Sequence, residues 1–454
     1  MIESYLEDAS GFRGHADRLL LPSDEQELVE IVRAANAERI PVTLSGAGTG
    51  VTGGRVARGG WVVSLEKFRK LEISRGEATA GAGVLLKELQ AAAAPTGQFY
   101  APDPTEWSAS VGGSIATNAS GSRSFLYGAT RRHVRRLRVL TMTGAVMDVQ
   151  RGDAIDFEAP HIRQPRATKH SAGYPLSPGM DWIDLFVGSE GTLGIVVEAG
   201  LRLLPLPAAL LTGVVFFPSD DAAIDAVEAW RPAERLRMLE YFDRGSLDLL
   251  RARYPEIPAA AGAAVLFEQE LSGDDDPEAD RWYERLESSG ALLEASWFAS
   301  GEADRERFRR FRHALPELVN DTVRRQGYMK MGSDYAVACE RNREMLAFYR
   351  ERADRLFPGR SVIFGHIGDA HVHVNVLPAG AEEVERAREL MIEFARKAVS
   401  LEGSVAAEHG LGKRKSHLLA LQYTPDEIEA MKGVKRRLDP NWLLGQGNLF
   451  PEPQ

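Results

Sequence analysis

Apolar residues recur three and four positions apart shortly before a glycine-rich stretch of the chain. They are Leu28, Ile31, Val32 and Ala35, and this spacing places them on one face of a helix. Ser23 and Gln26 resemble a capping box, so we expect the helix to begin near Asp24 and to end before Pro41. Its apolar face predicts a helix that packs against a core.

Short apolar runs follow this helix and are separated by turns. The runs at residues 42–44 and 61–65 predict two strands on either side of a glycine-rich loop at residues 46–60. Further short runs occupy residues 139–142, 145–149, 185–187, 195–197 and 201–204, between glycine-rich turns. This mixture of elements predicts an α+β domain.

Pro205 and Pro207 mark a change in the character of the sequence. A long charged helix is expected at residues 304–323, and strands are expected at residues 213–217, 263–268, 335–338 and 371–377. We therefore predict a boundary near residue 206 and a second α+β domain after it.

Length and composition limit the class of protein. A chain of 454 residues predicts two domains, and its net charge of −10 argues against general nucleic-acid binding. Cys339 is the single cysteine, which excludes an intrachain disulfide and a thiolate zinc or iron–sulfur cluster. No run approaches the roughly 20 apolar residues of a membrane span. The first ten residues lack the pattern of a secretory signal, so we expect a cytoplasmic protein, either free or peripheral to the inner membrane.

The glycine-rich loop contains a literal G-x-G-x-x-G sequence at residues 48–53. In a Rossmann site a helix follows the third glycine, but here the sequence leads directly into another strand. The loop fits better as a nest of backbone N–H groups around a pyrophosphate, assisted by the hydroxyls of Ser45, Thr49 and Thr52, although a tight structural turn is the alternative. Loops of small residues at 102–105, 111–121 and 187–195 favour an extended ligand.

Four of the ten histidines lie between residues 366 and 409. Alternation along the strand expected at 371–377 places His371, His373 and Asn375 on one face. His366 precedes them by a glycine turn, and Glu408 is followed directly by His409. Two imidazoles and a carboxylate make a metal site with open positions, whereas hydrogen bonding in a polar seam is the structural alternative.

These motifs, in this order, resemble a known family. Residues 20–206 resemble the FAD-binding domain of the vanillyl-alcohol oxidase and p-cresol methylhydroxylase superfamily, in the branch of D-lactate, glycolate-oxidase-subunit and D-2-hydroxyglutarate dehydrogenases. From about residue 300, the chain resembles the H-x-G-D-x-x-x-H and E-H-G motifs of that branch. The resemblance implies a two-subdomain FAD-binding domain at 1–206, an α+β substrate (cap) domain with an antiparallel sheet at 207–440, and a returning segment at 441–454.

The resemblance also implies which residues contact FAD. They are Ser45, Gly46, Ala47, Gly48, Thr49, Gly50, Asp103, Gly112, Gly113, Ala116, Thr117, Ser122, Tyr127, Glu190 and Ile195. The glycine loop contains no histidine that could tether the flavin, so we expect non-covalent FAD. His133 is the nearest histidine, and we expect it at the surface.

In the second half, the resemblance makes His366, His373 and Glu408 the ligands of a divalent metal, Zn or Mn, and His409 the base. It assigns substrate contacts to Asn375 and, for the carboxylate, to Arg312 and Lys330, with Arg309 or Arg310 as alternatives.

The chain departs from the family pattern at several positions. Ala370 and His371 stand where the family has Gly-Asn, so His371 is an extra ligand, a second base or an orienting partner. Pro316 replaces a threonine of the D-2-hydroxyglutarate enzymes, and Gln446 and Asn448 replace the proline and lysine of a closing N-P-G-K segment.

The predicted reaction is metal-assisted oxidation of a D-2-hydroxyacid, D-lactate or a similar acid, to the 2-oxoacid. His409 takes the hydroxyl proton while hydride moves to flavin N5. D-2-hydroxyglutarate and glycolate are alternative substrates, and a zinc hydrolase or a binding module without turnover is the alternative class. Expected partners are a separate electron acceptor (a quinone, an electron-transfer flavoprotein or a cytochrome) and a second copy of the chain in a homodimer.

Overall fold

The first long helix begins where the sequence predicts, with its cap one residue later. In the computed structural model, which describes residues 2–273 and 275–451, α1 spans Glu25–Glu38. The Asp24 side chain accepts a hydrogen bond from the Glu27 N–H, so Asp24 is the N-cap in place of Ser23. Leu28, Val32 and Ala35 are buried, as the spacing predicts.

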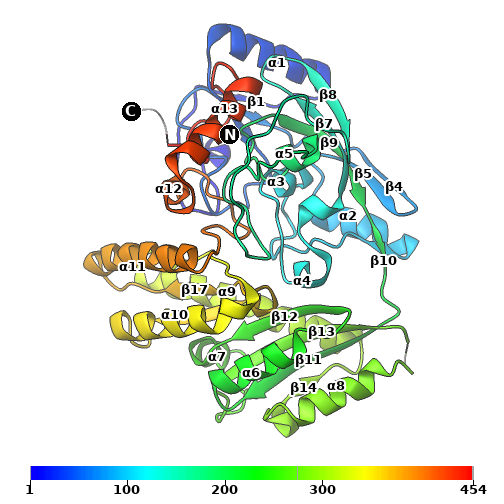
Figure 1. Cartoon of the computed structure of the whole chain (residues 1–454), viewed down its shortest axis with the longest axis vertical. Coiled ribbons are helices and arrows are strands. Elements are labelled where there is room, and N and C mark those ends of the chain that lie inside the picture. Colours follow the sequence, from blue (N-terminus) through cyan, green and yellow to red (C-terminus); the bar gives the residue numbers. More distant parts are fainter. Residues whose placement is uncertain (1, 274, 452–454) are drawn as a thin grey trace.

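Two larger sheets form most of the N-terminal half, which is the upper part of Figure 1. A parallel sheet has the order β1(Arg18–Leu20)-β3(Trp61–Ser64)-β2(Val42–Ser45). An antiparallel sheet has the order β4(Leu71–Ser74)-β5(Glu77–Gly81)-β9(Ile195–Arg202)-β7(Val134–Leu140)-β8(Val146–Gln150). Helices α2(Leu86–Ala93), α3(Val111–Ala116), α4(Ser124–Tyr127) and α5(Trp182–Phe186) accompany these sheets. The apolar run at 185–187 lies at the end of α5, not in a strand.

The chain leaves this half after β10(Leu204–Pro205), which pairs with β6(Gln98–Phe99). It then enters a seven-stranded sheet with antiparallel pairs, in the order β14(Trp297–Phe298)-β11(Ala209–Phe217)-β13(Ala263–Leu271)-β12(Leu236–Phe242)-β16(Ser361–Gly365)-β17(His373–Val376)-β15(Met331–Gly332). The expected strand at 335–338 does not form; Ala336 makes single bridges to His371 and Ser404.

Helices cover both faces of this sheet because successive strand residues point in opposite directions. Val215 and Phe217 face α6(Asp220–Trp230) and α8(Glu278–Glu287). Val214 and Phe216 face α7(Arg244–Leu250) and α9(Glu302–Gln326), the long charged helix that the sequence predicts. Helices α10(Asn342–Leu356) and α11(Ala381–Ser400) complete the lower half of Figure 1.

The C-terminal helices return to the N-terminal half before residue 441. In Figure 1, α12(Leu419–Gln422) and α13(Pro425–Leu438) lie with the upper sheets. Lys435 Nζ donates hydrogen bonds to the carbonyls of Thr192 and Leu444, at 2.6 and 2.8 Å, and Leu444 bridges to Val42. The returning segment is therefore longer than residues 441–454. Within the described ranges, no helix combines the length and apolar character required to cross a bilayer.

Candidate active site

The glycine-rich loop between β2 and β3 lines a cavity of the N-terminal half. Residues 46–60 are all described and form no helix, as the sequence predicts. The cavity has a volume of about 360 Å³, within the range of small-molecule and cofactor pockets. Predicted FAD contacts along its wall are Ser45, Gly46, Ala47, Gly48, Thr49, Gly50, Gly112, Gly113, Ala116, Thr117 and Glu190.

Glycines bring the backbone segments of this cavity close together. Gly48 has a φ of +81°, and a Cβ there would lie 2.4 Å from Arg55 Cζ. A Cβ at Gly46 would lie 2.7 Å from Ser110 Oγ, and Ser110 caps α3 by accepting a hydrogen bond from Gly113 N–H. The wall therefore presents backbone to a ligand.

Arg55 supplies a cation that the sequence analysis did not identify. Its Nη1 donates hydrogen bonds to Ser45 Oγ at 3.2 Å and to the Gly46 carbonyl at 3.1 Å. Because it also lines the cavity, it brings positive charge to the loop expected to hold a pyrophosphate. The residue follows the glycine run directly, but the sequence pattern pointed only to hydroxyls and backbone N–H groups.

The remaining predicted FAD contacts lie elsewhere. Asp103 accepts a hydrogen bond from Trp107 Nε1, and Tyr127 donates its hydroxyl proton to Glu270 of β13. Ser122 lines a second, small cavity, and Ile195 is buried in the core beneath the parallel sheet.

The expectation for His133 is wrong. It is only 2% exposed, because its ring packs edge-on against Tyr100, and its Nε2 lies 3.0 Å from the Tyr127 carbonyl.

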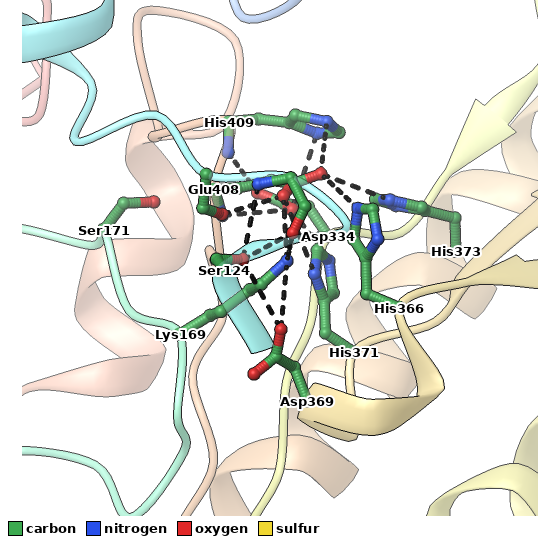
Figure 2. Close-up of polar contacts among 12 residues, drawn as sticks. Ser124, Lys169, Ser171, Asp334, His366, Asp369, His371, His373, Glu408 and His409 are labelled. Carbon is green, nitrogen blue, oxygen red and sulfur yellow. Dashed lines mark hydrogen bonds and ion pairs between the residues drawn. The ribbon is translucent and has the colours of Figure 1, made fainter. Parts of the chain in front are cut away.

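The histidine cluster gathers around Glu408, as Figure 2 shows, and Glu408 also lines this cavity. His366 follows β16, His373 opens β17, and Glu408 lies in the loop after α11. Glu408 Oε1 is 3.3 Å from His366 Nε2 and 3.4 Å from His373 Nε2. The three side chains that the resemblance names as ligands therefore point to one spot.

Hydrogen bonds at the opposite nitrogens orient two of these rings. His366 Nδ1 lies 2.5 Å from Glu240 Oε1, and His373 Nδ1 lies 3.2 Å from the Ser333 carbonyl. Since each Nδ1 donates to an oxygen, Nε2 is the nitrogen that the neutral ring would offer to a metal. Two imidazole nitrogens and a carboxylate oxygen that face one another are ligands that suit a divalent cation.

Glu240 connects the cluster to Arg312. The Arg312 Nε donates to Glu240 Oε2 at 2.7 Å. Burial works against the Glu240 charge, but Arg312 and His366 more than offset it and hold the pKa of Glu240 below its usual range. The Arg312 guanidinium is thus already paired with a carboxylate and also reaches Thr105 Oγ1 at 3.3 Å.

The second oxygen of Glu408 faces residues from the N-terminal half. Oε2 accepts a hydrogen bond from Ser120 Oγ at 2.9 Å and lies 3.3 Å from Lys169 Nζ. Lys169 is 3% exposed and also contacts the Gly121 carbonyl and Asp369. The sequence analysis did not assign Ser120 or Lys169 to the cluster. Ser120 lies in the small-residue loop at 111–121, which was expected to contact FAD, and Lys169 stands in no recognisable motif.

His409 lies between the cluster and the cavity, which it helps to line. Its ring stacks on His373 with centroids 5.4 Å apart, and its Nδ1 is 3.5 Å from Asp334 Oδ1. Asp334 also accepts a hydrogen bond from the His409 backbone N–H at 2.9 Å. Burial lowers the pKa of His409 to about 4, so the ring is neutral at neutral pH and keeps a lone pair.

The other predicted substrate residues occupy different environments. Asn375 is buried on β17, two residues after His373 and on the same face of the strand. Lys330 is half-buried before β15, and burial lowers its pKa. Arg309 lies over the Trp107 ring and Arg310 is exposed, so Arg312 is the arginine nearest to the cluster among these three.

Comparisons with known proteins identify the family of this chain. Residues 206–449 match the family described as "FAD linked oxidases, C-terminal domain", and residues 16–150 match "FAD binding domain". A D-2-hydroxyglutarate dehydrogenase of Xanthomonas citri pv. viticola is 32% identical, over 95% of this chain and 89% of that protein. A D-lactate dehydrogenase of Anaerostipes hadrus is 28% identical, over 98% of this chain and 92% of that protein.

A solved structure of alkyldihydroxyacetonephosphate synthase shares the fold at 16% identity, with a TM-score of 0.68, over 94% of this chain and 75% of that chain. With matches along nearly its whole length, the chain belongs to the FAD-linked oxidase family.

Proposed function

We propose that this chain oxidises a D-2-hydroxyacid to the 2-oxoacid, with FAD, a divalent cation and His409 as the base. One observation carries the proposal. Glu408 and His409 line the same cavity as the glycine loops, so a flavin there and a cation at the cluster would be neighbours. The names of the relatives, which include D-lactate and D-2-hydroxyglutarate dehydrogenases, support the same reaction class.

In the proposed reaction, His409 takes the proton of the substrate hydroxyl while two electrons and the Cα hydrogen leave as hydride. Bound FAD supplies the acceptor for that pair of electrons. A cation held by His366, His373 and Glu408 supplies the charge that acidifies the hydroxyl. Asp334 holds the His409 loop through the backbone and stabilises the imidazolium that forms.

A D-lactate-like acid is the substrate that we favour, with D-2-hydroxyglutarate and glycolate as alternatives. Arg312, Lys330 and Asn375 are the proposed carboxylate and substrate contacts. Pro316 lies within α9 and offers no hydroxyl to a second carboxylate. Reoxidation of the flavin is assigned to a separate quinone, electron-transfer flavoprotein or cytochrome.

The test is the visible spectrum of the purified protein under anaerobic conditions. D-lactate, D-2-hydroxyglutarate and glycolate are added separately, before and after chelation and with Mn²⁺ or Zn²⁺ restored. Bleaching of the flavin by one acid, lost on chelation and regained with metal, is the expected result. A protein that does not take up FAD would contradict the proposal and favour a hydrolase.

His409→Ala should retain FAD but lose flavin reduction. Removing one general base typically costs about 10²–10⁴-fold in rate. His161→Ala changes an exposed histidine and is the matched control. Reduction of the His409→Ala flavin at the rate of the unmodified protein would refute the role of this residue.

A further inference from the structure

His371 lies inside the cluster with its ring unsatisfied. The side chain is 0% exposed, and its centroid is 4.5 Å from that of His373 and 5.4 Å from that of His366. Neither ring nitrogen has a hydrogen-bond partner among the described residues. A buried polar group without a partner costs about 1–3 kcal/mol, so the ring is expected to have one in the loaded protein.

The positions of its two nitrogens indicate different partners. Nε2 is 3.2 Å from Asp334 Oδ1, within reach after a small rotation of the ring. Nδ1 faces the other side, 4.0 Å from Glu408 Oε2, which is too far for a hydrogen bond. Nδ1 therefore points toward the ligand carboxylate without bonding to it.

One ligand atom from each of His366, His371, His373 and Glu408 lies within 4.8 Å of every other. Metal bonds to nitrogen and oxygen are about 2.0–2.2 Å long, so opposite ligands are at most roughly 4.4 Å apart. The 4.8 Å limit exceeds the span of two opposite ligands by only a few tenths of an ångström.

We propose that His371 is a fourth protein ligand of the metal through Nδ1, with Asp334 accepting the hydrogen bond from Nε2–H. The inference rests on the proposed function and extends its ligand set. A carboxylate that orients a ligating imidazole is common in metal sites. Four protein ligands leave a six-coordinate ion two positions, the number that the hydroxyl and carboxylate of a 2-hydroxyacid occupy.

The same observations argue against the other two roles open to His371. A base must reach the substrate, yet this ring has no exposed surface, whereas the His409 side chain is 32% exposed and lines the cavity. A residue that orients Glu408 must bond to it, and the nearest His371 nitrogen is 4.0 Å from that carboxylate.

The experiment uses the FAD-loaded protein, stripped with a chelator and titrated with Zn²⁺ alone. His371→Asn removes the imidazole and keeps a small polar group, and His409→Asn is the matched control in the same cluster. The retained flavin spectrum reports that each variant is folded. Affinity comes from the titration, and the number of imidazoles around zinc comes from X-ray absorption.

The unmodified protein and His409→Asn should each show three imidazoles, and His371→Asn should show two. Loss of an orienting partner weakens metal binding by about 10–100-fold, so loss of a direct ligand should exceed about 100-fold. Two imidazoles in the unmodified protein, or an unchanged number in His371→Asn, would overturn the assignment.

Flavin reduction by the three acids is measured on the same samples. If an acid reduces the flavin while zinc has two imidazoles, the assignment of His371 fails and the proposed function stands. If zinc has three imidazoles but no acid reduces the flavin, the assignment stands and the proposed function fails.

Discussion

Acid should destabilise this protein through His133. The residue closes the 3-10 helix Thr130–His133, where Nε2 donates to the Tyr127 carbonyl and Nδ1 lacks a partner among the described residues. Burial lowers its pKa from 6.5 to about 4. Between these values the unfolded chain binds a proton that the folded chain does not, so stability falls as pH falls.

The size of the effect follows from the shift. Each pKa unit corresponds to 1.36 kcal/mol, so lowering the pH from 6.5 to 5 removes about 2 kcal/mol. The full difference reaches roughly 3 kcal/mol near pH 4. This is a large fraction of the roughly 5–15 kcal/mol by which domains are stable.

The assay is urea unfolding of the FAD-loaded protein at pH 6.5 and pH 5. His133→Gln can keep the hydrogen bond to Tyr127 but cannot be protonated, so it should lose about 2 kcal/mol less than the unmodified protein over this interval. His161→Gln, at an exposed position, should behave like the unmodified protein. Equal losses for His133→Gln and the unmodified protein would refute the reasoning.

Three further changes test other parts of the structure. Gly433→Ala, at an exposed position inside α13 with open space around it, should raise the free energy of unfolding by about 1 kcal/mol, which thermal unfolding measures. Glu190→Ala leaves the buried N–H groups of Leu411 and Gly412 unpaired, and each should cost about 1–3 kcal/mol of stability. Hydrogen exchange in the 410–412 loop should therefore become faster, and an unchanged exchange rate would contradict this. Lys169→Met removes the ammonium beside the Glu408 carboxylate and should lower the stability of the metal-free protein by about 3–5 kcal/mol. Urea unfolding with and without Mn²⁺ tests this, because a cation at Glu408 should make the loss smaller.

Local patterns in the sequence were sufficient to predict much of the fold. The spacing of apolar residues predicted α1, and the proximity of a second strand correctly excluded a Rossmann helix after the glycine loop. The apolar run at 185–187 does not have a helical period. It nevertheless lies at the end of a short helix, which begins after the N-cap Asp181. Short apolar runs do not distinguish helix from strand.

The clustering of the candidate ligands was predicted only where the residues share a motif. His366, His373 and Glu408 were predicted as ligands because they stand in the H-x-G-D-x-x-x-H and E-H-G motifs. Asp334 and Lys169 were missed, since each reaches the cluster only through tertiary packing. Their contacts depend on chain segments separated by 75 and 239 positions, which no local pattern encodes.

Glu408 is shared between the two halves of the molecule, and this limits how the protein can be divided or recombined. Its Oε1 faces histidines of the C-terminal half, while its Oε2 is held by Ser120 and Lys169 of the N-terminal half. A chimaera that joins the halves of two relatives must therefore preserve this junction as well as each domain. A substitution at Lys169 changes the charge beside Glu408, so a change in one half alters the environment of a carboxylate in the other.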